Sequence, residues 1–296
     1  SILSNPAASS AAFSLNKNSA KLQQSLNRLS SGKKITTPAD DAGGLAVSMK
    51  LSSAITRNRS VISNIQNALS FAEVQDGALT SAATIVNRMA ELKSMSMDVL
   101  KSSSDKANYN VEFQALQTQL HSIASEAFNG VTLFSSESTK TFGTHAVNVT
   151  IFTSDLGANG STVSLGKALL VSAVTFTSGT STAAAAAGAT GSKSLAVASG
   201  GSKVSVGELG VSFFTKALEN IATLRATNAA GMARLQLAED HARLTMANLE
   251  AANSRIMDVD VAEESTRFAK YNILTQASAA MLSQANQASS TALLLL

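Results

Sequence analysis

Cysteine is absent from this chain, so disulfide bonds and thiolate chemistry are excluded. The 296 residues include only two prolines, Pro6 and Pro38, which leaves long uninterrupted helices free to form. Tryptophan is also absent, and aromatic residues make up only 4% of the chain. Much of the 45% apolar fraction is alanine, which favours closely spaced helices over a core of bulky side chains.

Long apolar runs are missing too. No stretch approaches the roughly 18–20 apolar residues of a membrane-spanning helix, and the cluster Leu293–Leu296 is too short to anchor the chain, so we expect no membrane partner. The net charge of +3 is small and scattered, which argues against a nucleic-acid partner. No cationic segment followed by an apolar one opens the sequence, so we expect no ordinary signal peptide.

The residues that would carry catalysis are sparse. The three histidines are far apart in sequence, and neither a zinc-binding His pair nor a phosphate-binding loop is present. Four acidic residues do gather near the last helix, and we interpret them as a solvated charge cluster rather than a cation site. They are Asp258, Asp260, Glu263 and Glu264. We therefore expect no enzyme activity, no cofactor and no bound metal.

Both ends of the chain lack charge. The segment Tyr271–Leu296 has apolar residues three or four apart, which is the spacing of one helix face, but its other face carries amides and hydroxyls instead of charges. Ser1–Asn16 is also uncharged. A helix on the surface of its own domain normally presents charges to solvent. We therefore predict that the two ends run side by side and pack against neighbouring copies.

Helical periodicity dominates the remainder. It predicts a helix that begins before Lys17 and ends near Leu29, followed by a turn in which Asp40 and Asp41 cap the next helix. Further helices are expected over about 45–100, 106–127 and from 213 onward, with heptad spacing typical of coiled-coil packing.

The middle of the chain has a different character, with three charged residues between 141 and 202. Short strands are expected at 131–134, 146–152, 162–165 and 170–177, with turns at Asn129-Gly130 and Asn159-Gly160. The stretch from Thr180 to Gly191 is of low complexity, and we interpret it as an exposed loop.

Several motifs occur in an order that resembles bacterial flagellin. The run Leu26–Ile35 followed by Asp40–Ala46 is similar to the family's N-terminal signature, and Phe128–Leu133 matches it further along. Near the other end, Ser254–Asp260 and Leu282–Gln287 are similar to the family's last helices. The resemblance covers about residues 1–135 and 207–296.

This resemblance implies a mainly α fold built in layers. N- and C-terminal coiled-coil helices (1–43 and 254–296) would form the inner filament core, a helical bundle (44–140 and 207–253) would surround it, and a small β-rich insert (141–206) would face outward. The resemblance also implies a structural subunit that polymerises into the flagellar filament, with terminal helices that fold on assembly. We assign filament-core packing to Leu3, Phe13, Leu15, Leu22, Leu26, Leu29, Ile273, Leu274, Met281, Ala285, Ala288 and Leu293.

The resemblance further implies partners and a location. The expected partners are copies of the same chain, the flagellar cap and hook-junction proteins, and an export chaperone at the C-terminus, with secretion through the flagellar export apparatus to the extracellular filament. A Toll-like receptor is the fifth expected partner, contacting Arg88 and Leu92, although the usual supporting acidic residue is replaced near Ala115–Leu116. Two alternatives stay open: a hook–filament junction protein, and a flagellin-like chain with a metallopeptidase insert, which the short insert without a His pair disfavours.

Overall fold

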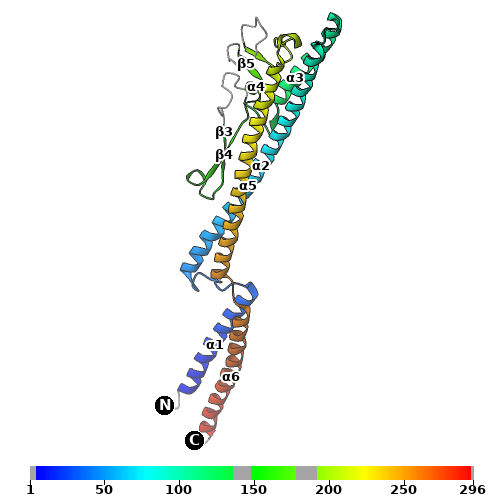
Figure 1. Cartoon of the computed structure of the whole chain (residues 1–296). Helices are drawn as coiled ribbons and strands as arrows, with labels where there is room; N and C mark the ends of the chain where they lie inside the picture. Colours follow the sequence, from blue (N-terminus) through cyan, green and yellow to red (C-terminus); the bar gives the residue numbers. More distant parts are fainter. Residues whose placement is uncertain (1–4, 136–147, 178–191, 295–296) are drawn as a thin grey trace. The chain divides into compact units, whose positions relative to one another are not determined.

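The computed structural model describes residues 5–135, 148–177 and 192–294. In the last helix, side chains are described only up to Gln287. Long helices occupy both ends of the sequence, and a few short strands lie in the middle (Figure 1). The predicted mainly α fold class is confirmed. The chain divides into two compact units, one of residues 1–56 with 245–296 and one of residues 57–244.

In the first unit, helix α1 (Pro6–Ser31) lies beside helix α6 (Val261–Leu294) (Figure 1). The side chain of Asn5 caps α1 by accepting hydrogen bonds from the amides of Ala7 and Ala8, and Pro6 occupies the first turn, where no amide hydrogen is needed. Gly32 ends α1 with φ at 68°, a left-handed conformation that suits glycine. The predicted start and end of this helix, and the pairing of the two chain ends, are confirmed.

The two connections to these helices pair with each other. The amide of Lys34 donates to the carbonyl of Met257, and the amide of Val259 donates to the carbonyl of Gly32, at 2.6 Å and 3.1 Å. These bonds frame an antiparallel bridge between the connection that follows α1 and the connection that precedes α6. The result is that the end of α1 and the start of α6 are held in register by backbone bonds.

Only one of the two predicted aspartate caps is present on helix α2 (Ala42–Ser96). The carboxylate of Asp41 accepts the amide of Gly44 at 2.8 Å, as an N-cap does. Asp40 turns back instead, toward Thr36 and Thr37 in its own loop and toward α1. The prediction that Asp40 caps α2 was therefore wrong.

The second unit is built on α2, helix α3 (Ser103–Ala124) and helix α5 (Val211–Met257). The heptad column on α2 is fully buried at Ile65, Ala72, Leu79 and Val86, and faces a common core with α3 and α5. A capping box between Ser102 and Asp105 starts α3. Two boundaries differ from expectation: α2 ends at Ser96 rather than near residue 100, and α3 ends at Ala124 rather than near 127.

Two antiparallel hairpins follow α3. Strands β1 (Ala127–Phe128) and β2 (Val131–Thr132) meet at Asn129-Gly130, whose φ angles of 49° and 79° confirm the predicted tight turn. Strands β3 (Asn148–Phe152) and β4 (Thr162–Gly166) pair through a wider loop that contains the 3₁₀ turn η1 (Gly157–Asn159). The hairpin predicted around Asn159-Gly160 is present, but these two residues lie at the end of η1 and the left-handed residue of the loop is Gly157.

The strand predicted over 170–177 was wrong in its first half. Leu170–Ala173 forms a short helix, α4, and only Thr175–Thr177 forms a strand, β5, which pairs with β6 (Ser192–Ser194). Leu170 and Ala173 are both fully buried at helical spacing, and the Asn220 side chain donates to the carbonyl of Ala173 at 2.8 Å. The 3₁₀ turn η2 (Val206–Glu208) precedes α5. The predicted loop at 180–191 lies outside the described residues.

The strands of the middle segment share the core of the long helices. Leu165 on β4 is buried, and an added side-chain carbon on Gly231 of α5 would lie only 2.7 Å from its Cδ1 atom. Arg57 on α2 and Asp155 in the β3–β4 loop form an ion pair at 3.1 Å. The β3–β4 hairpin is therefore held against both α5 and α2.

Candidate assembly interface on the terminal helices

The pairing of α1 with α6 relies on small and polar side chains. The Asn5 amide donates to the carbonyl of Ala285 at 2.9 Å, and the Asn18 amide donates to the hydroxyl of Ser278 at 2.9 Å. Alanines and serines line a groove between the two helices, together with Leu274 and Met281. Small side chains allow the helices to approach closely, but they remove little apolar surface from water.

The inward face of α6 follows a strict alternation of four and three residues, as in a coiled coil. Its members are buried or half-buried, and they are Glu264, Phe268, Tyr271, Thr275, Ser278, Leu282 and Ala285. The large apolar residues predicted for filament packing on α6, which are Ile273, Leu274 and Met281, lie outside this repeat. Ile273 is 65% exposed and Met281 is 67% exposed. The helix therefore has a polar-rich face toward α1 and an uncovered apolar face.

None of the predicted filament-core side chains that the structure describes is buried within the chain. Phe13 and Leu26 are 71% and 54% exposed, and Leu274 is 37% exposed. Four others are half-buried, and they are Leu15, Leu22, Leu29 and Ala285. Leu3 and the side chains of Ala288 and Leu293 lie outside the described set. The exposed members of this set, which are Phe13, Leu26, Ile273, Leu274 and Met281, therefore remain available for contacts outside the chain.

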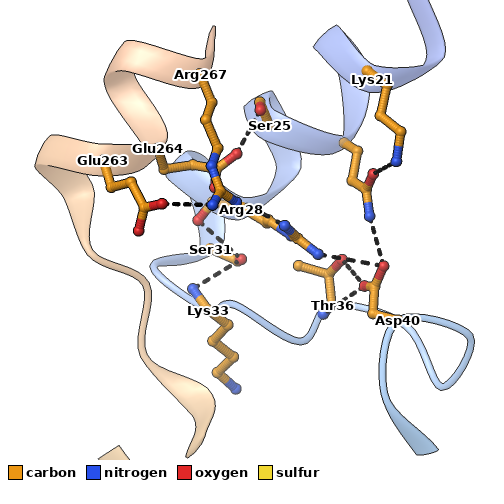
Figure 2. A network of polar contacts seen from close by, with 11 residues as sticks. Lys21, Ser25, Arg28, Ser31, Lys33, Thr36, Asp40, Glu263, Glu264 and Arg267 are labelled. Atoms are coloured by element: carbon orange, nitrogen blue, oxygen red, sulfur yellow. Dashed lines mark hydrogen bonds and ion pairs between the residues drawn. The ribbon is translucent and has the colours of Figure 1, made fainter. Parts of the chain in front are cut away.

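A cluster of charged and polar side chains joins the end of α1 to the start of α6 (Figure 2). The Ser25 hydroxyl donates to the carboxylate of Glu264 at 2.5 Å. Arg28 lies between two carboxylates, with nitrogen-to-oxygen distances of 3.9 Å to Glu264 and 3.6 Å to Asp40. Arg267 on α6 approaches Glu264 at 3.8 Å. The Glu264 side chain is only 5% exposed, so screening by water is weak there.

Asp40 holds the loop after α1 against that helix. Its carboxylate accepts the amides of Thr36 and Thr37, each at 3.1 Å, and the side-chain amide of Gln24 at 2.7 Å. The hydrogen bond from the Thr37 amide, with those from Thr36 and Gln24, holds the pKa of Asp40 well below its usual value because each favours the ionised form. Asp40 is therefore a charged anchor for the loop at neutral pH.

The interpretation of the acidic residues at 258–264 as a solvated cluster was wrong for Glu264, which is 3% exposed. Glu264 is the first residue of the inward four-and-three repeat of α6. That repeat was the signal in the sequence that could have revealed its burial, but the residue was grouped with its acidic neighbours instead. Asp258 and Asp260 are exposed, and Asp260 caps α6 by accepting the amide of Ala262 at 2.9 Å. Across residues 5–135, 148–177 and 192–294, no group of three or more His, Asp or Glu residues is placed to hold a metal ion.

The two residues assigned to receptor contact differ in accessibility. Leu92 is fully buried in the core of the second unit, where it continues the buried face of α2, and its assignment to receptor contact stays a prediction. Arg88 is exposed on α2 and forms ion pairs with Glu112 on α3 at 2.8 Å and with Glu91 at 3.0 Å. The acidic partner of Arg88 on α3 is therefore Glu112. The hydrogen bond from Arg88 to Glu112, followed by the one to Glu91, raises the pKa of Arg88 above its usual value.

Comparisons with known proteins agree with this architecture. Residues 2–139 match the bacterial flagellin N-terminal helical region, and residues 211–296 match the bacterial flagellin C-terminal helical region. The flagellar filament 33 kDa core protein of Treponema phagedenis is 32% identical over 277 residues, covering 93% of this chain and 92% of that protein. A flagellin of Listeria innocua is 32% identical over 274 residues, covering 92% and 91% respectively.

No helix within the described residues is long and apolar enough to cross a membrane. The matches fall on the two segments that build the paired helices α1 and α6 and the bundle of α2, α3 and α5. The chain belongs to the bacterial flagellin family and is a structural subunit of the flagellar filament, not an enzyme.

Proposed function

We propose that α1 and α6 fold and become buried only when copies of the chain polymerise, so that their apolar faces form the inner core of the filament. One observation carries this proposal. The only buried side chain described on α1 is that of Ser25, and the only one described on α6 is that of Glu264. A pair of helices without a buried apolar side chain has little to hold it together in water.

The energetic comparison supports folding on assembly. Ordering the backbone costs roughly 1–2 kcal/mol per residue, and α1 and α6 contain 26 and 34 residues. Burial of a large apolar side chain returns about 1.5–3 kcal/mol, but Phe13, Ile273 and Met281 stay exposed within the chain. Contacts with neighbouring copies would supply the missing burial.

A matched pair of substitutions on α1 tests this proposal. Phe13→Ala removes an apolar side chain that is 71% exposed, whereas Lys17→Ala removes an exposed charged side chain one turn later. If Phe13 is buried by neighbours, its loss costs about 1.5–3 kcal/mol, which raises the critical concentration for polymerisation roughly ten- to hundred-fold. Lys17→Ala should leave it within about threefold. Equal critical concentrations for the two variants would count against the proposal.

The segments of the chain would occupy different layers of the filament. We assign residues 1–43 and 254–296 to the inner core, 44–140 and 207–253 to the surrounding layer, and 141–206 to the outer insert. The filament would be extracellular, reached through the flagellar export apparatus, with the cap and hook-junction proteins at its ends. The export chaperone would bind the C-terminal segment. Deleting residues 290–296 should weaken both polymerisation and chaperone capture, and unchanged capture would exclude this site.

A role as a hook–filament junction protein is the second candidate function, but no observation on this chain favours it. The relatives described above are named as a flagellin and a filament core protein.

For immune recognition, we propose weak binding of the monomer by a Toll-like receptor through Arg88, which is accessible beside Glu91 and Glu112. A receptor assay in which Arg88→Ala has no effect would remove this proposal.

A further inference from the structure

A cleft of about 340 Å³ lies between the end of α1 and the start of α6, inside the first compact unit. Four of the side chains that line it are cations, and they are Lys21, Arg28, Arg267 and Lys270. One lining side chain is acidic, that of Glu264. The lining therefore carries an excess of three positive charges, four minus one. We call the cleft formed by these five residues the basic cleft.

Helical spacing and one buried carboxylate bring the cations together. Lys21 and Arg28 are two helical turns apart, so they share a face of α1. From α6, Arg267 enters the same cluster (Figure 2). The Glu264 carboxylate lies 3.9 Å from Arg28 and 3.8 Å from Arg267, so it holds one guanidinium group from each helix beside the cleft. Positive charge from two helices therefore converges on one space.

The guanidinium of Arg28 is short of hydrogen-bond partners. Its side chain is 18% exposed, and its Nε atom is buried with no hydrogen-bond partner among the residues that the structure describes. The carboxylates beside it, on Asp40 and Glu264, lie 3.6 Å and 3.9 Å away, beyond hydrogen-bond distance. A buried donor without an acceptor is costly, and a guanidinium has five donors. An oxygen-bearing anion in the cleft would therefore stabilise Arg28.

The two lysines carry the positive charge that the chain itself leaves unbalanced. Lys21 donates to the side-chain oxygen of Gln24 at 3.1 Å, which is a neutral partner. The Lys270 ammonium forms neither a hydrogen bond nor an ion pair with any described residue. Even when carboxylates outside the lining are counted, four cations face three acidic groups, and these are Asp40, Glu263 and Glu264. All three pair with the arginines, so an external anion would find its free partners in the lysines.

We propose that the basic cleft binds one small tetrahedral oxyanion, inorganic phosphate or sulfate. A guanidinium group binds two oxygens of such an anion at once, and a lysine binds it as a point charge. A tetrahedral anion offers oxygens toward both helices, which suits donors that arrive from α1 and from α6. The site requires α1 and α6 to be paired, so the inference rests on the proposed function and names an anion that favours this pairing.

Binding of the anion should promote polymerisation. If only the assembled form binds it, the critical concentration falls by a factor of one plus the ratio of free phosphate to its Kd. At a phosphate concentration of about ten times the Kd, the fall is roughly tenfold. Phosphate also strengthens the burial of apolar surface without any specific site, so the effect has to depend on the residues of the cleft.

The direct test measures phosphate binding to sedimented filaments at neutral pH and constant ionic strength. Filaments of the unmodified chain are assembled in sodium chloride, incubated with radiolabelled inorganic phosphate and pelleted. We expect saturation near one phosphate per chain. Replacing part of the chloride with sulfate should displace the phosphate, whereas replacing it with acetate should not. A diffuse layer of counter-ions would respond to ionic strength alone, which is held constant here.

A matched pair of variants locates the site. Lys21→Gln combined with Lys270→Gln should weaken phosphate binding by roughly tenfold or more, because both unbalanced cations of the cleft are lost. Lys17→Gln is the control, since Lys17 is an exposed lysine one turn earlier on α1 that does not line the cleft. Exchanging chloride for phosphate should also lower the critical concentration of the control variant by a larger factor than that of the double variant.

Filaments that bind no phosphate would overturn the proposal, as expected if a carboxylate of a neighbouring copy filled the cleft. Equal phosphate affinity of the double variant and the Lys17→Gln control would overturn it as well. If the double variant does not assemble, the competition on unmodified filaments decides, and equal displacement by sulfate and acetate would refute the site. Phosphate binding by the monomer, with the same loss in the double variant, would support the cleft but count against folding on assembly.

Discussion

Replacing Glu264 with alanine should weaken polymerisation far more than replacing its neighbour Glu263. The Glu264 side chain is 5% exposed and accepts the Ser25 hydroxyl from α1 at 2.5 Å. The Glu263 side chain is 63% exposed and pairs with Arg267 within α6. The two residues have the same charge and lie in the same helical turn, so the comparison isolates the buried contact between α1 and α6.

The expected difference follows from the contacts. A hydrogen bond to a charged group contributes about 1.5–3 kcal/mol, and Glu264 loses one from Ser25. Its ion pairs with Arg28 and Arg267 are long, at 3.9 Å and 3.8 Å, so we add little for them. The exposed pair of Glu263 contributes about 0.3–0.5 kcal/mol. At about 1.4 kcal/mol per factor of ten, Glu264→Ala raises the critical concentration roughly ten- to hundred-fold, and Glu263→Ala less than about threefold.

The assay is sedimentation of filaments over a series of protein concentrations at neutral pH. Ser25→Ala removes the same hydrogen bond, so Ser25→Ala combined with Glu264→Ala should be little worse than Glu264→Ala alone. Equal shifts for Glu263→Ala and Glu264→Ala, or full additivity of Ser25→Ala with Glu264→Ala, would refute the reasoning.

Three further predictions concern packing, shape and pH. Gly231→Ala should lower the melting temperature of the monomer, because its Cβ would lie 2.7 Å from the side chain of Leu165 and overpacking costs about 1–3 kcal/mol. In a Leu165→Ala chain the same substitution should raise the melting temperature, because only the gain in helix propensity of about 1 kcal/mol remains. Ala285→Val should bias the filament toward one fixed shape by about 1–3 kcal/mol of strain, and electron microscopy showing a normal waveform would contradict this. Because the pKa of Asp40 is lowered in the folded chain, its stabilisation is present above about pH 4 and is lost as pH falls below it. The protection of the Thr37 amide in the filament, expressed relative to its intrinsic exchange rate at each pH, should therefore fall in acid, and Asp40→Asn should abolish that pH dependence.

Local signals in the sequence predicted much of the helical architecture. The Ser-Ser-Gly end of α1 and the Asn129-Gly130 turn each rest on backbone conformations that glycine and asparagine favour, so the sequence specifies them directly. The heptad column through Ile65 and Leu79 was also predictable, because burial follows the helical repeat. These elements depend on contacts within one or two turns of the chain.

Elements that depend on distant contacts were not predictable in the same way. The run Leu170–Ala173 is apolar enough for either strand or helix, and its helical form depends on the core formed with α5, including the hydrogen bond from Asn220. The sequence shows that Arg28 and Glu264 are charged, but only the pairing of α1 with α6 places them together. The exposed apolar turn of Met97, Val99 and Leu100 was missed because the periodicity was extended past Ser96, where the helix ends.

The central claim, that α1 and α6 become ordered when copies assemble, is tested most directly by amide hydrogen exchange on monomer and filament. Exchange is compared residue by residue at the same pH and temperature, with the buried part of α2 near Leu79 as an internal reference that is protected in both forms. The account predicts strong protection of residues 1–30 and 268–296 in the filament and rapid exchange there in the monomer. Equal protection of these segments in both forms would contradict it.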